Sequence, residues 1–174
     1  MNNEKRIFLF TAVVVFFAAA VSIWWFYPKP ELVPDISLKT IDGKQVALNS
    51  LRGKTILISF WATSCSTCTQ EIPHLVDLYN DMNMEGLEII GIAMSYDPPN
   101  LVLNFSENRN IPYTIALDID GSAAKAFGNI IATPTNLLID PDGKVIFKKT
   151  GVVDIENLRH QIELLLTKTD TTYS

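Results

Sequence analysis

The run Thr55–Trp61 constrains the fold more than any other feature, because it is almost continuously apolar and stops shortly before the chain's only two cysteines, Cys65 and Cys68. A strand with one face in water alternates apolar and polar residues, whereas a strand covered on both faces reads as a continuous apolar run. The run therefore predicts a central strand that is covered on both faces. The two cysteines then lie where this strand passes into a helix.

Strand and helix patterns alternate along the rest of the chain, which predicts an α/β domain with a mixed central sheet. Asp42-Gly43 marks the turn of a hairpin, and Gly86 marks the end of the helix that follows the cysteines. The predicted elements are, in order, a hairpin over 36–48, a strand over 55–61, a helix over 69–84, a strand over 87–94, a helix over 98–110, a strand over 113–117, a helix over 123–127, a hairpin over 135–149 and a helix over 155–166.

A segment of 21 residues without a charge, 7–27, precedes this domain. About 20 helical residues cross the hydrocarbon layer of a membrane, so the segment predicts a transmembrane helix. Lys5 and Arg6 lie just before it, and positive charges stay on the cytoplasmic side of a membrane. We therefore expect residues 1–6 to be cytoplasmic and the domain to be exported.

A cleavable signal peptide is the alternative interpretation of this segment. Ala18-Ala19-Ala20 offers the small-x-small spacing that a signal peptidase recognises. Cleavage there would leave an exposed apolar end beginning at Val21, which favours the retained anchor. The predicted organisation is a cytoplasmic start (1–6), an anchor (7–27), a linker (28–34), a folded domain (35–167) and a polar tail (168–174).

The charge balance of the exported part argues against some partners. Beyond Pro28 the chain has 12 basic residues (14 less Lys5 and Arg6) and 18 acidic residues (19 less Glu4), hence a net charge of −6 and no basic run. Nucleic acids and anionic lipid surfaces attract basic patches. We therefore expect this domain to bind no nucleic acid, and the membrane to be contacted through the N-terminal helix.

The spacing of Cys65 and Cys68 indicates a reactive pair. A structural disulfide usually closes a long loop, whereas this one would close almost none. At the start of a helix, unpaired backbone N–H groups and the helix dipole lower the pKa of a thiol. We expect Cys65 to be the exposed, attacking thiol, and Cys68, one turn later, to resolve the mixed disulfide.

A zinc site is the alternative for the two cysteines, but it needs about four ligands. The chain has no second cysteine pair, and its only histidines, His74 and His160, do not have metal-ligand spacing to the cysteines. We therefore expect no metal. His74 is predicted on a helix surface and His160 on the last helix.

The stretch Phe60-Trp61-Ala62-Thr63-Ser64-Cys65-Ser66-Thr67-Cys68, followed by Glu71, Pro73 and Ala132-Thr133-Pro134-Thr135, resembles the thioredoxin superfamily. Within it, the chain is similar to the TlpA/ResA/CcmG group of membrane-anchored bacterial thioredoxins from about Leu32 to Leu166. The expected fold is thioredoxin-like, with an N-terminal β-hairpin and a central helix–strand insertion between Pro98 and Leu117, preceded by one transmembrane helix.

The resemblance also implies roles for single residues. Thr133-Pro134 matches the cis-proline loop, which in the family lies beside the cysteines and pairs with the substrate backbone; the alternative is a trans proline that opens the strand 135–139. Trp61 matches the tryptophan that flanks the active site, with a core aromatic residue as the alternative. We expect Trp61, Thr133 and Pro134 to bind substrate.

Two positions in the helix after the cysteines also match the group. Pro73 matches a proline that kinks this helix, since a proline inside a helix removes one backbone hydrogen bond. Glu71 matches the carboxylate that ResA-like proteins place behind the cysteine pair, where it can exchange a proton with the second thiol. The alternative is a glutamate stabilised by the helix dipole and surrounded by solvent. We count Glu71 with Cys65 and Cys68 as catalytic.

By resemblance, the expected activity is thiol–disulfide exchange by a domain tethered to the bacterial inner membrane, on its periplasmic or extracytoplasmic side. The expected substrate is a disulfide of an exported protein, such as the haem-binding Cys-x-x-Cys of an apocytochrome c. The expected electron donor is a transmembrane thiol protein, and no organic cofactor is expected. The dipeptide Ser66-Thr67 differs from those of relatives whose potentials span about −270 to −120 mV, so it leaves the redox potential open.

Two other functions fit parts of the pattern. A thiol peroxidase of the peroxiredoxin type shares the fold and the insertion, but it has a Pro-x-x-x-Thr/Ser-x-x-Cys pattern whose proline is missing before Cys65. A non-catalytic metallochaperone of the Sco copper type has Cys-x-x-x-Cys and a distant histidine, and the spacing here does not match it. Peroxide consumption and copper titration would separate these functions from disulfide exchange.

Overall fold

The computed structural model describes residues 3–26 and 31–172. The chain divides between Pro30 and Glu31 into two units. The first contains one helix, α1 (Asn3–Phe26), whose described side chains are exposed. Counted over the described positions, no helix is long and apolar enough to cross a membrane. Residues 1–2, 27–30 and 173–174, which belong to the predicted cytoplasmic start, anchor, linker and tail, lie outside the described residues.

The second unit is built on a single sheet of seven strands. The strands are β1 (Ser37–Thr40), β2 (Gln45–Ala47), β3 (Thr55–Trp61), β4 (Leu87–Ala93), β5 (Thr114–Leu117), β6 (Thr135–Ile139) and β7 (Val145–Thr150). Their order in the sheet is β2-β1-β5-β4-β3-β6-β7. β3 is parallel to β4 and antiparallel to β6, and all seven of its residues are buried. The predicted central strand and the mixed sheet are thus confirmed.

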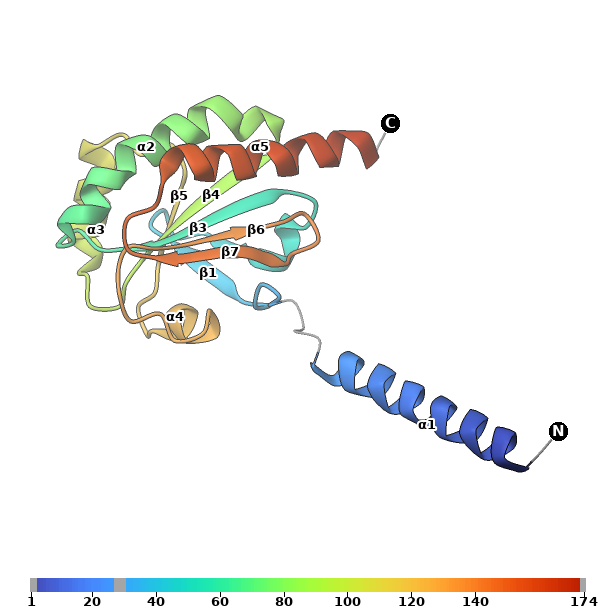
Figure 1. Ribbon diagram of the computed structural model, residues 1–174. Coiled ribbons are helices and arrows are strands. Elements are labelled where there is room, and N and C mark those ends of the chain that lie inside the picture. Colours follow the sequence, from blue (N-terminus) through green and yellow to red (C-terminus); the bar gives the residue numbers. More distant parts are fainter. Residues whose placement is uncertain (1–2, 27–30, 173–174) are drawn as a thin grey trace. The chain divides into compact units, whose positions relative to one another are not determined.

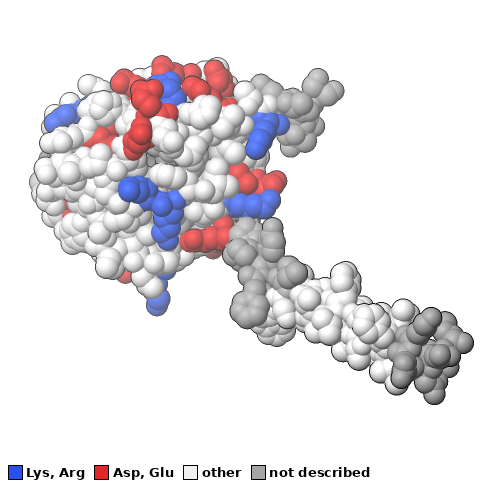
Figure 2. All heavy atoms as spheres, in the orientation of Figure 1, with Lys and Arg blue, Asp and Glu red and all other residues white. Residues whose placement is uncertain are grey.

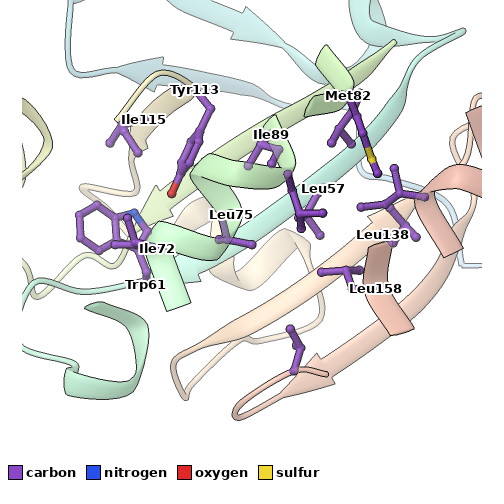
Figure 3. Close-up of a cluster of buried hydrophobic side chains, with 14 of the residues drawn as sticks. Leu57, Trp61, Ile72, Leu75, Met82, Ile89, Tyr113, Ile115, Leu138 and Leu158 are labelled. Carbon is purple, nitrogen blue, oxygen red and sulfur yellow. The ribbon is translucent and has the colours of Figure 1, made fainter. Parts of the chain in front are cut away.

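Helices cover both faces of this sheet (Figure 1). The helices are α2 (Ser66–Met82), α3 (Pro99–Asn108), α4 (Ser122–Ala126) and α5 (Ile155–Thr172), with short 3₁₀ turns η1 (Leu48–Leu51) and η2 (Asn83–Glu85). Side chains alternate along β3, so Leu57 and Trp61 pack under α2, α3 and α5, while Ile58 and Phe60 pack against α4 and η1. Figure 3 shows the first of these two apolar clusters.

The predicted additions to a plain thioredoxin fold are both present. The β1–β2 hairpin turns at Gly43, whose φ of 82° suits glycine. The insertion consists of α3 and β5, and β5 pairs with β4 on one side and with β1 on the other. The inserted strand therefore attaches the N-terminal hairpin to the central sheet.

The folded domain begins at Glu31, four residues before the predicted start at residue 35. Leu32 forms a β-bridge with Lys144. The backbone N–H of Val33 donates to the carbonyl of Gly143 at 2.9 Å, and that of Val145 donates to the carbonyl of Glu31 at 2.8 Å. Residues 31–33 of the predicted linker thus extend the β6–β7 hairpin, because their backbone groups find partners there.

The ends of two helices differ from the prediction. α2 begins at Ser66 instead of residue 69, because Cys65 already caps it. α5 continues to Thr172, so residues 168–172 of the predicted polar tail are helical. The apolar periodicity stops at Leu166, but the polar residues that follow include no glycine or proline to end a helix.

Charged side chains of both signs are interspersed on the face of the domain seen in Figure 2. Several charges form ion pairs, such as Arg159 with Asp81 at 2.7 Å and Lys148 with Glu31 at 3.6 Å. Exposed pairs of this kind are each worth at most about 1 kcal/mol. The two apolar clusters on either side of β3 therefore supply most of the stability of the domain.

Candidate active site

Cys65 and Cys68 form a disulfide at the amino end of α2, with an S–S distance of 2.17 Å. Cys65 is the N-cap residue of the helix, and its Sγ accepts a hydrogen bond from the backbone N–H of Cys68 at 3.2 Å. The hydroxyl of Thr67 lies 3.3 Å from the same sulfur. Cys65 is half-buried, whereas Cys68 is only 1% exposed. Another molecule can therefore reach Cys65, which is the more accessible cysteine of the pair.

The loop between β3 and the cysteines is fixed by Asp97. The carboxylate of Asp97, 6% exposed, accepts hydrogen bonds from the backbone N–H of Thr63 (2.5 Å) and from its hydroxyl (2.7 Å). Asp97 follows β4, which is parallel to β3, so the carboxyl ends of both strands lie at one edge of the sheet. Asp97 was not among the predicted site residues, although an aspartate shortly after a buried neighbouring strand is a signal for such a contact.

The loop before β6 reaches the same edge of the sheet. The peptide bond Thr133–Pro134 is cis, as predicted, so the trans alternative is wrong. β6 runs antiparallel to β3 with Thr135 opposite Phe60. This register places the cis-proline loop beside the end of β3 from which the chain continues to Cys65.

Exposed apolar side chains surround the cis-proline loop. The hydroxyl of Tyr96 lies 3.5 Å from that of Thr133, and the backbone N–H of Gly151 donates to the carbonyl of Pro134 at 2.8 Å. These contacts bring the segments around residues 96 and 151 to the loop. Large exposed side chains in these segments and in the loop itself are those of Tyr96 (58% exposed), Ile131 (89%) and Val152 (64%).

Glu71 lies one turn after Cys68 on α2 and is 6% exposed. Its Oε1 and Oε2 accept hydrogen bonds from Nδ2 of Asn136 at 3.1 and 3.2 Å. Burial raises the pKa of Glu71 above its ordinary value, while hydrogen bonds from Asn136 and from the backbone N–H of Val153, and the charge of His74, act in the opposite direction. The alternative of a solvent-surrounded glutamate is wrong, because the sheet and the segment before α5 cover this part of α2.

Asn136 was not among the predicted site residues. It lies in β6, whose five residues are all buried, and it is 0% exposed. A single amide inside an otherwise apolar strand is the signal that could have drawn attention to it, since a buried polar side chain needs a partner. The identity of that partner, 65 positions away in the sequence, required the fold.

Trp61, which was predicted to bind substrate, lies in the apolar core in this structure. Its side chain is 2% exposed and packs against Phe105 with a centroid distance of 5.4 Å. Figure 3 shows the indole inside the apolar cluster. Gly91 leaves room for it, because a Cβ there would lie 3.1 Å from the indole Nε1. As the last residue of a strand buried on both faces, Trp61 is a core aromatic residue.

The remaining predicted positions are also placed. Pro73 lies inside α2, and His74 and His160 are exposed on α2 and α5. Among the described residues, no group of three or more His, Cys, Asp or Glu side chains is arranged to hold a metal ion. The site thus consists of the cysteine pair at the amino end of α2, the cis-proline loop beside it and the carboxyl group of Glu71 behind it.

Comparisons with known proteins agree with this arrangement. A profile of the AhpC/TSA family matches residues 31–148. The thiol–disulfide oxidoreductase ResA of Bacillus thuringiensis subsp. konkukian is 34% identical over 136 residues, which are 78% of this chain and 75% of that protein. ResA of Bacillus subtilis is 25% identical over 174 residues, with 95% of this chain and 96% of that protein covered.

The fold is also shared with solved structures. The crystal structure of a thiol:disulfide interchange protein of the thioredoxin family from Chlorobium tepidum matches with a TM-score of 0.73 and 28% identity, covering 80% of this chain and 99% of that chain. Family, fold and the bonded Cys-x-x-Cys pair agree. The chain belongs to the AhpC/TSA family of thioredoxin-like proteins and is a thiol–disulfide oxidoreductase of the ResA type.

Proposed function

We propose that this protein is a membrane-tethered reductase that delivers electrons to disulfides of exported proteins. The observation that carries the proposal is the arrangement of one reachable sulfur, Cys65, one buried sulfur, Cys68, and a buried carboxyl group, Glu71, one turn further along α2. A reductase of this kind needs an attacking thiol, a resolving thiol and a group that accepts the proton of the resolving thiol.

The reaction follows from these positions. In the reduced protein the Cys65 thiolate attacks one sulfur of the substrate disulfide, which breaks, and the departing substrate sulfur takes up a proton. The Cys68 thiol then gives its proton to the Glu71 carboxylate, and its sulfur attacks that of Cys65. This step forms the Cys65–Cys68 disulfide and releases the second substrate sulfur, which is protonated in turn. Two electrons have then passed from protein to substrate, and two electrons from a thiol donor restore the pair.

The residues around the pair support reduction over general oxidation. A strongly oxidising pair has a reduced form stabilised by a deeply lowered thiolate pKa. Ser66 and Thr67, between the cysteines, bring no positive charge to the sulfurs. The buried carboxylate of Glu71 acts in the opposite sense, because a nearby negative charge disfavours a thiolate.

The surroundings of Cys65 support a polypeptide substrate. The cis-proline loop lies beside the attacking sulfur, and the exposed side chains of Tyr96, Ile131 and Val152 offer apolar contact area around it. An extended segment that carries a disulfide can pair its backbone with the loop at Thr133 while apolar neighbours cover these side chains. The haem-binding Cys-x-x-Cys of an apocytochrome c is the substrate that the resemblance to the ResA group suggests.

The membrane tether is supported by the sequence of the first unit. Residues 7–27 carry no charge and follow Lys5 and Arg6. In this proposal the helix holds the domain at the periplasmic or extracytoplasmic face of the bacterial inner membrane. A transmembrane thiol protein in the same membrane then serves as electron donor.

Equilibration with glutathione tests the direction of the reaction. The full chain in detergent is incubated with glutathione buffers of defined ratio, and the fraction of Cys65–Cys68 disulfide is read by thiol alkylation and mass. We expect a potential near the reducing end of the family range of about −270 to −120 mV. A value close to −120 mV would defeat the proposal. A Cys68→Ser variant in cells should retain the natural substrate as a mixed disulfide on Cys65, which identifies it.

A further inference from the structure

Asn136 is a buried amide near the start of β6, and it donates hydrogen bonds to the carboxyl group behind the cysteines. Its Nδ2 lies within hydrogen-bond distance of both carboxyl oxygens of Glu71. Its Oδ1 is buried and has no hydrogen-bond partner among the residues that the structure describes. Buried polar atoms nearly always have a hydrogen-bond partner. An amide whose NH₂ group is hydrogen-bonded while its carbonyl oxygen is not therefore needs an explanation.

We propose that Asn136 is a positioning residue for disulfide exchange: it holds Glu71 behind Cys68 and sets the pH range in which Glu71 takes up and returns the proton of the Cys68 thiol. This inference rests on the proposed proton transfer between Cys68 and Glu71. It adds a residue from β6 to a pair of groups that both belong to α2.

The two halves of the amide match the two protonation states of Glu71. The NH₂ group is a donor and satisfies a carboxylate, which can only accept. Once Glu71 carries a proton it becomes a donor itself, and the carbonyl oxygen of the amide is then the partner it needs. A half-turn of the amide about its last torsion exchanges one group for the other without moving the backbone. The Oδ1 of Asn136, which has no partner among the described residues of the oxidised protein, is the acceptor for protonated Glu71.

The other groups around Glu71 leave this role to Asn136. The backbone N–H of Val153, before α5, also favours the carboxylate, but it has no acceptor for the protonated form. The titratable side chain that acts on Glu71 through its charge is His74 on α2, and the charge of Glu71 in turn raises the pKa of Tyr113 before β5. Lys149, opposite Asn136 on β7, is exposed. None of these offers a carbonyl oxygen to the carboxyl group.

An Asn136→Leu substitution removes both halves of the amide at similar volume. A hydrogen bond to a charged group is worth enough to move a titration by about one to two pH units. We expect the midpoint of the Glu71 carboxyl carbon signal, followed by NMR on the full oxidised chain in detergent, to move upward by that amount. The pH profile for single-turnover reduction of an oxidised Cys-x-x-Cys peptide should move in the same direction, because Glu71 must be ionised to accept the proton.

Three further variants separate this role from a structural one. Asn136→Thr replaces the amide by a hydroxyl that both donates and accepts, and threonine suits a strand, so this variant should show a smaller shift. It also covers the case in which the leucine variant does not fold. In a Glu71→Gln background, Asn136→Leu should leave the pH profile unmoved. Asn104→Leu, the same change at an exposed asparagine of α3, is the matched control and should leave both midpoints in place.

The outcomes distinguish the inference from the proposed function. Unmoved carboxyl midpoints in both Asn136 variants would overturn the inference and leave the reductase proposal intact. A moved carboxyl midpoint with an unmoved rate profile would also overturn it, because Glu71 would then stand outside the reaction. A wild-type protein that fails to reduce the peptide at any pH would defeat the proposed function instead, whatever the variants do to the carboxyl signal.

Discussion

Glu71 is buried at a position where its ionised form is disfavoured, and this has a consequence for stability. Burial raises its pKa above the ordinary value of 4.5 in the folded protein only. The folded state therefore binds a proton more tightly than the unfolded chain does. The stability that this proton contributes is fully present below the unfolded pKa and is lost as the pH rises through the folded pKa.

We predict that Glu71→Gln stabilises the oxidised protein at pH 8 and does so less and less toward pH 4. Each pH unit by which the pKa is raised is worth about 1.4 kcal/mol of the difference in free energy of unfolding. Urea denaturation of wild type and variant across this pH range is the measurement. A stability difference that does not depend on pH would mean that Glu71 ionises as freely in the folded protein as in the unfolded chain.

The two sulfurs differ in exposure and in surroundings. Cys65 is half-buried, caps α2 and receives the backbone N–H of Cys68, whereas Cys68 is 1% exposed. We predict that iodoacetamide labels Cys65 of the reduced protein at least about ten times faster than Cys68 near pH 7, because a thiolate at a helix amino end is both stabilised and reachable. Peptide mapping by mass spectrometry gives both rates. Equal rates, or faster labelling of Cys68, would contradict the assignment of the attacking thiol.

At the scale of elements, the site is assembled from chain segments that follow different strands. The cysteines follow β3, Asp97 follows β4, and the cis-proline loop precedes β6. Asp97 joins the first two segments through its hydrogen bonds to Thr63. The position of Cys65 therefore depends on a carboxylate that touches no sulfur.

We predict that Asp97→Ala lowers the free energy of unfolding by about 1.5–3 kcal/mol, since it removes two hydrogen bonds to a carboxylate and leaves the part-buried backbone N–H of Thr63 without its partner. Reduction of a peptide disulfide should slow as well, because the loop that carries Cys65 loses its fixed position. Asp77→Ala, at an exposed position of α2, is the control and should change stability by less than about 0.5 kcal/mol. Equal stability of the two variants would show that the Asp97 contact is dispensable.

The elements that could be predicted from the sequence are those fixed by local patterns. β3 matches its predicted bounds, because a continuous apolar run between turn residues leaves few alternatives. Cys65 and Cys68 follow from spacing, and Thr133–Pro134 from resemblance. Asp97 and Asn136 escaped prediction because their partners lie 34 and 65 positions away. The burial of Trp61 also depends on distant partners, because its side chain packs against Phe105 of the inserted helix α3.

At the scale of the whole molecule, the chain divides into α1 and a domain with its own sheet and apolar clusters. We predict that a chain starting at residue 31 is folded and soluble, and reduces a peptide disulfide at the rate of the full chain within about twofold, because the site draws its residues from the second unit alone. Circular dichroism and the peptide assay test this.

A shorter version that starts at residue 35 should be less stable, since it lacks the backbone bonds of residues 31–33 to the β6–β7 hairpin. Equal stability of the two versions would contradict the boundary at Glu31.

The chain enters the domain at a point that lies far from the cysteine pair. Glu31–Val33 lies against Gly143–Val145, and Val145 pairs with Ile139, which in turn faces Ile56 near the start of β3. Cys65 follows the opposite end of that seven-residue strand, about 20 Å away along the sheet. The attachment point at Glu31 and the reactive Cys65 thus lie at opposite ends of the domain. A bead, a lipid or an unrelated carrier protein can therefore be joined at residue 31 without changing the reaction of Cys65 and Cys68. The domain should work in the same way on any of these supports.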